Sequence, residues 1–155
     1  MNPVHPALAR LARAAKEMPG QDCAGALREA LSNPAWLRPE HRIGDPTAYM
    51  RHVLYVDPQG AFVMTAITWL PGQKSPVHGH QVWCAYGVAE GELTEERFHE
   101  TNGNLSLVRT SVYKPGEIAV VLHWSRFIER YTYTKGHAAA MAHVAWRVAR
   151  IAVYY

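Results

Sequence analysis

The sequence predicts a mainly β protein, an antiparallel β-barrel preceded by two short helices. Apolar residues recur at helical spacing within residues 1–35, and from residue 49 onward they give way to segments rich in β-branched and aromatic residues. Turns containing glycine or proline separate these segments at short intervals, which is typical of antiparallel barrels and sandwiches. The chain has 155 residues, of which 48% are hydrophobic and 19% charged. This composition is globular, and the length suits one domain.

The composition also limits the classes of partner and compartment. The formal net charge is +3, and the basic residues are scattered, so we expect neither nucleic acid nor a membrane as a partner. Cys23 and Cys84 are the only cysteines in the sequence, too few for a disulfide framework. The N-terminus lacks the apolar core of a signal peptide, and no apolar run approaches membrane-spanning length. We therefore expect a cytoplasmic protein, and we expect it to be a monomer.

Two helices are expected before the barrel. Their apolar residues recur every three or four positions, and they end at Pro19-Gly20 and at Asn33-Pro34. Strands are expected over residues 51–56, 61–70, 82–88, 93–99, 105–113 and 117–122. Residues 136–155 stay ambiguous, because their pattern of alanine, valine and arginine fits a helix as well as one or two strands.

The residues with the clearest chemistry lie between two turns, Pro71-Gly72 and Glu90-Gly91. Between them lies a short His-Gly-His sequence on an expected strand. Residues two apart on a strand face the same side, so His78 and His80 point in the same direction. Two neighbouring imidazoles are part of a metal site, and imidazole suits iron, zinc, copper or nickel. The sequence therefore predicts a metal-binding barrel.

This segment resembles the first conserved motif of the cupin superfamily and, more narrowly, the cysteine dioxygenase family of thiol dioxygenases. The resemblance rests on residues 69–73, 75–80, 87–88 and 90–93, extends upstream through residues 49–55, and covers residues 34–122. It implies a cupin-type antiparallel β-barrel (double-stranded β-helix) that holds Fe(II) on three histidines. A small thiol and O2 would be the substrates, and a sulfinic acid the product. The expected single domain, 1–155, has a helical N-terminal segment (1–35), a barrel core (49–125) and a divergent C-terminal segment (126–155).

The resemblance also assigns roles to single residues. His78 and His80 match the first two iron ligands of the family. Arg51 matches the arginine that binds the substrate carboxylate, with Tyr49 beside it. Arginine suits this task because its planar guanidinium donates two parallel hydrogen bonds and stays charged. Cys84 lies near the cysteine that some members cross-link to a tyrosine, although a cysteine on an apolar strand is also a small hydrophobic residue.

The third ligand departs from the family pattern. The family places Ile-His-Arg thirteen residues beyond the glycine of a Pro-Gly turn, and counting from Gly116 reaches Glu129. Glu129 would complete a set of two histidines and one carboxylate, as in many nonheme Fe(II) oxygenases. The alternative is that Glu129 is a surface residue in a loop. His123 is the competing third ligand, and His137 is another candidate.

A second departure lies close to the C-terminus. His143 matches a supporting histidine of the family, but the tyrosine expected two residues later is Ala145. Three functions stay open on these grounds. The first is a thiol dioxygenase acting on cysteine or 3-mercaptopropionate. The second is a cupin that binds a ligand without catalysis, and the third is an oxygenase with two histidines and one carboxylate that acts on a non-thiol substrate.

Overall fold

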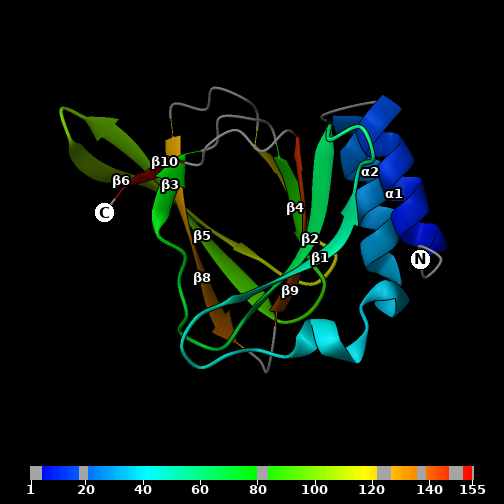
Figure 1. Cartoon of the computed structure of the whole chain (residues 1–155). Helices are drawn as coiled ribbons and strands as arrows, with labels where there is room; N and C mark the ends of the chain where they lie inside the picture. The colour runs from blue at the N-terminus through cyan, green and yellow to red at the C-terminus, as the bar shows by residue number, and fades with distance from the viewer. Residues whose placement is uncertain are drawn as a thin grey trace.

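The computed structural model of the chain describes residues 5–17, 21–79, 84–121, 127–135, 139–146 and 152–154, with side chains for residues 5–17, 23–79 and 84–121. Within these residues, two helices precede two five-stranded antiparallel sheets (Figure 1). The helices are α1 (Pro6–Glu17) and α2 (Gln21–Ser32), followed by two 3-10 helices at Pro34–Trp36 and Pro39–Arg42. Neither α1 nor α2 is long and apolar enough to cross a membrane.

Each sheet combines strands from distant parts of the chain. The first sheet consists, in spatial order, of β1 (Met50–Val56), β2 (Phe62–Trp69), β9 (Ala139–Trp146), β4 (Cys84–Val88) and β7 (Ile118–Val121). The second consists of β10 (Ala152–Tyr154), β3 (Val77–Gly79), β8 (Phe127–Lys135), β5 (Glu92–Thr101) and β6 (Asn104–Tyr113).

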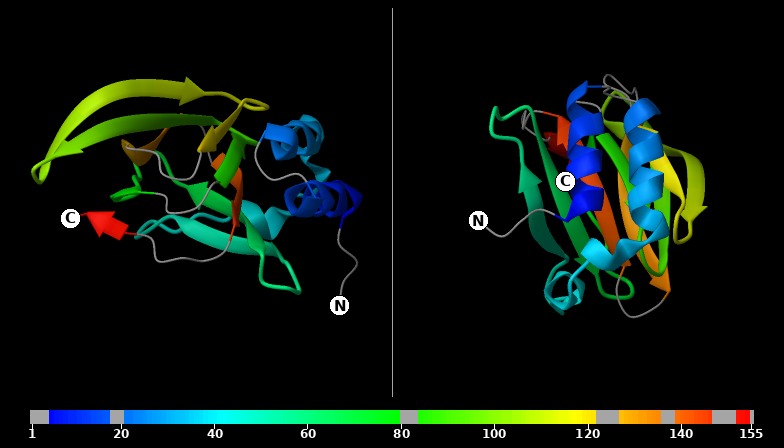
Figure 2. Two further views of the ribbon diagram at one scale, coloured as in Figure 1. Left: turned by 90° about the horizontal axis from the view of Figure 1, so that it is seen from above. Right: turned by 90° about the vertical axis from the view of Figure 1, so that its right-hand side faces the viewer.

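The helices cover the outer face of the first sheet, as Figure 2 shows. Their apolar stripes are buried against alternate residues of β2 and β4, because residues two apart on a strand share a face. This packing confirms the two helices expected from the sequence. The cluster comprises Leu8, Leu11, Ala12, Ala15, Cys23, Leu27 and Leu31 on the helices, Trp36 and Leu37 after them, and Phe62, Met64, Ala66, Ala85 and Ala89 on the sheet side.

The other face of the first sheet looks into the barrel. Its residues on β2, β4 and β7 form a second buried cluster with one residue of β5 from the opposite sheet. The members are Ile67, Trp69, Cys84, Tyr86, Val88, Leu93, Ala119 and Val121. This alternation identifies the inward-facing position on each strand, and therefore the residues that can contribute to a site in the barrel.

The strands expected from the sequence are confirmed at six places, with ends shifted by a few residues. The ambiguous C-terminal stretch contains strands, and β9 lies in the middle of the first sheet between β2 and β4. The strands of the barrel therefore continue beyond residue 125, where the barrel core was expected to end. Ala142 pairs with Ala66 on β2 and with Gly87 on β4, and such pairing between distant segments is not visible in a local sequence pattern.

Candidate functional site

The Pro-Gly turn positions β3, as the sequence predicts. Gly72 has a positive φ of 85°, which a glycine adopts without steric cost. The side chain of Gln73 accepts a hydrogen bond from the Leu70 amide at 2.8 Å and donates one to the carbonyl of Asp45 at 2.7 Å. The turn is thus fastened to the connection before β1, and β3 begins at Val77.

His78 on β3 is held in one tautomer. Its Nδ1 lies 2.9 Å from the carbonyl oxygen of Pro76, and because a carbonyl only accepts, Nδ1 must donate. The lone pair of the ring is therefore on Nε2, and this kind of backbone hydrogen bond is common for metal-binding histidines. Burial lowers the pKa of His78 and the charge of Arg51 lowers it further, although the hydrogen bond to Pro76 acts in the opposite direction. The ring is neutral near pH 7, the form that metal binding requires.

Glu129 lies in the strand β8 and not in a loop, so the loop alternative was wrong. Its Cα is the register partner of His78 on β3. On the other side its partner is Arg97 on β5. Positions that pair directly across antiparallel strands share a face of the sheet, so His78, Glu129 and Arg97 occupy one row on the inner face.

Arg51 and Tyr49 contact each other, and the charge of Arg51 acts on His78. Arg51 Nη2 donates to the hydroxyl of Tyr49 at 3.0 Å, and its Cζ lies 5.3 Å from the centroid of the Tyr49 ring. The ring of Tyr49 in turn lies 5.6 Å from that of Trp69 in the barrel interior. The register partner of Arg51 is the inward-facing Ile67, and its charge acts on His78. The structure thus brings these predicted residues together from two sheets.

The supporting positions lie next to one another on β4 and β9. The side chain of Cys84 is buried in the barrel interior, and its Cα partner on β9 is Ala145. The position where the family has a tyrosine is therefore adjacent to Cys84, but alanine cannot form the cross-link. His143 pairs with Thr65 on β2 and with Tyr86 on β4, which places it on the inner face.

The side chains of the remaining candidate ligands are not among those that the structure describes. His80, His123 and His137 lie outside the described residues, and Glu129 and His143 are described by their backbone. Among the described side chains, no group of three histidine, cysteine, aspartate or glutamate residues is arranged to hold a metal ion. The neutral imidazole of His78, with its Nδ1 engaged by a carbonyl, has the chemistry of an iron ligand and fits the ion.

Sequence reasoning missed a polar cluster inside the barrel. The carboxylate of Glu95 is fully buried and accepts hydrogen bonds from the hydroxyls of Tyr86 and Tyr113, the latter at 3.2 Å. Arg97 Nε donates to the same carboxylate at 3.0 Å. Burial, with the charge of Glu95 as the second cause, raises the pKa of Tyr113. The signal in the sequence was the alternation of Leu93, Glu95 and Arg97, which puts two charges on a buried face.

Three buried polar atoms on strands have no hydrogen-bond partner among the described residues. They are Nε2 of His52 on β1, Nε1 of Trp69 on β2 and Oγ of Ser111 on β6. A buried donor without a partner is unusual in a folded protein and indicates a bound water or ligand, or a strained site. The hydroxyl of Ser111 and the indole N–H of Trp69 are thus donors without a partner in the described part of the chain.

Comparison with known proteins bears on the fold. No protein-family model matches the chain. The structure is similar to that of TT1209 from Thermus thermophilus, with a TM-score of 0.55, 17% identity, and coverage of 70% of this chain and 91% of that chain. An uncharacterized protein with a double-stranded β-helix domain from Klebsiella pneumoniae has a TM-score of 0.53 and 20% identity, with 74% and 85% covered.

A cupin superfamily protein from Desulfitobacterium hafniense is also similar, with a TM-score of 0.52, 10% identity, and 68% and 83% of the two chains covered. Similarity at these identities establishes the fold and leaves the activity undetermined. The fold predicted from the sequence is confirmed: the chain has the double-stranded β-helix fold of the cupins.

Proposed function

We propose that the protein is an Fe(II)-dependent thiol dioxygenase. It would add both atoms of O2 to the sulfur of cysteine, or of the similar carboxylated thiol 3-mercaptopropionate, and release a sulfinic acid. One observation carries the proposal: the register of β3 and β8 pairs His78 with Glu129 on the inner face of the barrel. Counting from Gly116 matches Glu129 to the third ligand of the thiol dioxygenases, and Glu129 is the residue that pairs with His78.

His78, His80 and Glu129 would hold the iron, with His123 as the alternative third ligand. A bound Fe(II) would supply the redox chemistry with O2 that protein side chains lack. The protein's part is to keep His78 neutral and oriented. Its Nδ1–H is engaged by the carbonyl of Pro76, so Nε2 carries the lone pair.

Arg51 and Tyr49 would bind the carboxylate of the substrate. Arg51 is an exposed residue whose guanidinium is oriented by the phenol of Tyr49. Its charge acts on His78, so a carboxylate bound to Arg51 would lie close to the histidine. The buried indole N–H of Trp69, which contacts the ring of Tyr49, is a further donor for a polar substrate group.

The same register also favours a second candidate function, an oxygenase with two histidines and one carboxylate that acts on a non-thiol substrate. A carboxylate ligand brings a negative charge close to the metal, and this charge weakens the binding of an anionic thiolate. A cupin that binds a ligand without catalysis is the third possibility, because Ala145 replaces the expected tyrosine.

The test is to load the metal-free protein anaerobically with Fe(II) and then to measure oxygen uptake and sulfinate formation with cysteine and with 3-mercaptopropionate. The natural sequence is compared with Glu129→His and Glu129→Ala, and with Glu17→Ala on the exposed end of α1 as a matched control. Sulfinate from the natural protein would support the proposal, and the ratio of the two products would identify the substrate.

The other outcomes separate the alternatives. If only Glu129→His forms sulfinate, the barrel is a thiol dioxygenase that has lost a ligand. If the natural protein retains iron but forms no sulfinate, and Glu129→Ala loses the iron, the non-thiol oxygenase is favoured. If Glu129→Ala retains iron and activity, Glu129 is not a ligand and His123 takes its place. If no variant retains iron, the ligand-binding cupin is the better description.

The role of Arg51 has its own test in an active preparation. Arg51→Gln should lower kcat/KM for cysteine about 10- to 150-fold, which corresponds to the loss of charged hydrogen bonds worth about 1.5–3 kcal/mol. The turnover of cysteamine, a thiol without a carboxylate, should change little. An equal loss with both thiols would mean that Arg51 does not bind the carboxylate.

A further inference from the structure

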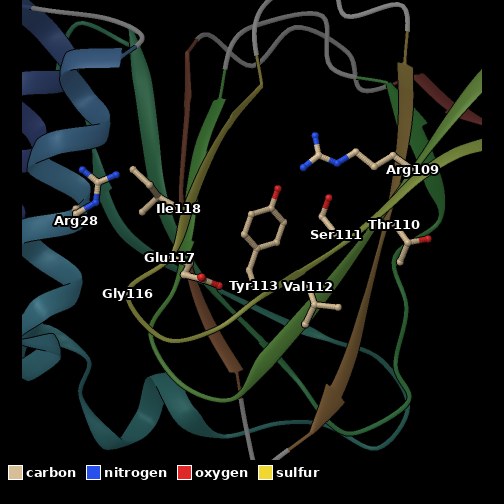
Figure 3. Close-up of a pocket in the computed structure, with 9 residues that line it drawn as sticks. All are labelled: Arg28, Arg109, Thr110, Ser111, Val112, Tyr113, Gly116, Glu117 and Ile118. Atoms are coloured by element: carbon tan, nitrogen blue, oxygen red, sulfur yellow. The ribbon is translucent and has the colours of Figure 1, made fainter.

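A pocket of about 480 Å³ lies between the second sheet and α2 (Figure 3). It lies where β6, the edge strand of the second sheet, turns into β7, the edge strand of the first, and α2 forms its outer wall. Strands β3 and β6 are three positions apart in their sheet, which corresponds to about 14 Å. Neither His78 nor Arg51 is among the residues that line the pocket.

Two arginines from different elements line this pocket, Arg28 on α2 and Arg109 on β6. Neither guanidinium makes a hydrogen bond or an ion pair within the described part of the chain. One carboxylate, that of Glu117, also lines the pocket, but it accepts a hydrogen bond from the Lys114 amide at 2.6 Å and so belongs to the turn. The positive charge of the pocket thus exceeds its negative charge.

The position of Arg109 in the sheet leaves its charge unbalanced. It pairs directly with Arg97 on β5, and like charges at directly paired positions repel one another. The charge of Arg97 is balanced by its ion pair with the buried Glu95. A bound anion would balance the charge of Arg109, as the carboxylate of Glu95 balances the charge of Arg97.

Ser111 is the second, independent observation. Its hydroxyl is buried without a hydrogen-bond partner in the described structure, and the residue lines the pocket. Figure 3 shows the Ser111 hydroxyl, the Arg109 guanidinium and the Tyr113 phenol on the same side of β6. An oxygen acceptor of a ligand beside Ser111 would satisfy this hydroxyl and would lie next to the Arg109 charge.

We propose that this pocket binds a small organic anion through a carboxylate or phosphate group, with Arg109 and Ser111 on one anionic group and Arg28 on the more distant part of the ligand. The volume is in the range of small-molecule sites and far exceeds that of an inorganic ion. The apolar side chain of Ile118 lies on the wall beside Arg28 and suits a short carbon skeleton. The proposal does not depend on the activity proposed above.

The test uses the full-length, metal-free protein without any thiol, so that the iron site plays no part. Succinate, inorganic phosphate and the neutral analogue succinamide are titrated, by calorimetry and by following the arginine Nε–H resonances in NMR spectra. Succinate should shift the resonances of Arg28 and Arg109 and leave that of Arg51 unchanged. Succinamide should shift none of them, and phosphate should shift Arg109 more than Arg28.

Variants then identify the contacts. Arg109→Gln should weaken succinate binding at least about 10-fold, because a charged hydrogen bond is lost. Ser111→Ala should weaken it several-fold without lowering the melting temperature, because the hydroxyl has no partner in the protein to lose. Arg13→Gln, an exposed arginine on α1, is the matched control and should bind as the natural protein does.

Four results would overturn the proposal. The first is an absence of shifts at Arg28 and Arg109 with both anions at about 10 mM, a concentration above any useful affinity for such a site. The second is equal binding by Arg109→Gln and the natural protein. The third is equal binding of succinate and succinamide. A loss of binding in Ser111→Ala together with a lower melting temperature would assign Ser111 a structural role instead, and would also count against the proposal.

Discussion

Replacing Glu95 by glutamine is expected to destabilise the fold by about 3 kcal/mol, although the side chain keeps its size and shape. Glu95 is fully buried and accepts hydrogen bonds from Tyr86, Tyr113 and Arg97. All three partners are donors, so the site requires an acceptor with several lone pairs. A carboxylate meets this requirement, and an amide has one oxygen to offer and adds a donor of its own.

The magnitude follows from the surroundings of the ion pair. The Arg97 side chain is 23% exposed and lies 3.0 Å from the carboxylate of Glu95, so its charge is largely removed from water. Breaking a buried ion pair by neutralising one partner costs about 3–5 kcal/mol, because the other charge stays buried. The glutamine oxygen can still accept from one tyrosine, which returns about 1 kcal/mol. The net loss of about 3 kcal/mol corresponds to about 6–12 °C in the melting temperature of a chain of this size.

The measurement is urea unfolding of the metal-free protein at pH 7, with Glu29→Gln as the matched control. Glu29 forms an ion pair with Arg10 at 3.1 Å, but both side chains are more than half exposed, so the same substitution should cost less than about 1 kcal/mol there. A loss of under about 1 kcal/mol for Glu95→Gln, equal to that of the control, would refute the conclusion that Glu95 is a buried charge balanced by Arg97.

Three further predictions concern single sites elsewhere. Burial of the ring and the charges of nearby arginines lower the pKa of His41 below its ordinary 6.5, so the unfolded chain binds more protons. Stability should therefore rise with pH in the window below 6.5, and urea unfolding at several pH values should show this dependence reduced in His41→Gln. A Cβ at Gly87 would lie 2.3 Å from Cδ1 of Leu31 on α2, so Gly87→Ala should lose about 1–3 kcal/mol, and Leu31→Ala in the same chain should restore part of it. Burial raises the pKa of Cys23 to about 11, so iodoacetamide at neutral pH should modify this thiol in urea but not in the folded protein.

Much of the fold was predictable because its helices and hairpins follow from local sequence patterns. The helices follow from apolar stripes that need one face to be buried, and β5 and β6 follow from the Asn102-Gly103 turn, where both residues adopt the positive φ of a tight hairpin. The position of β9 was not predictable in this way. Its alanines suit a helix or a strand, and its pairing with β2 and β4 joins segments far apart in the sequence.

In the candidate site, too, the local features were predictable from the sequence and the pairings between distant strands were not. His78 was identified because the turn before it and the two-residue spacing are local features. The loop alternative for Glu129 failed because only the register of β8 against β3 and β5 reveals its position. The partners of Glu95 were missed for a related reason. The alternation along β5 indicates a buried face, but the partners Tyr86 and Tyr113 lie on β4 and β6, and only the fold brings these strands together.

One row of directly paired residues crosses four strands of the second sheet. It runs from His78 through Glu129 and Arg97 to Arg109, so a histidine and a carboxylate are followed by two arginines. In the proposed dioxygenase, the carboxylate of Glu129 would remove one positive charge from the metal centre compared with a third histidine. The attraction for an anionic substrate would then depend more on fixed cations near the site.

The charge of Arg51 acts on His78, whereas Arg97 is balanced by Glu95 and Arg109 lines the pocket beside α2. Substrate binding should therefore rely on Arg51 more strongly in the natural protein than in Glu129→His, where the metal itself would supply the missing charge. The loss in kcat/KM caused by Arg51→Gln would accordingly be larger in the natural background. Equal losses in the two backgrounds would show that the two positions act independently, and that Glu129 does not set the charge of the metal centre.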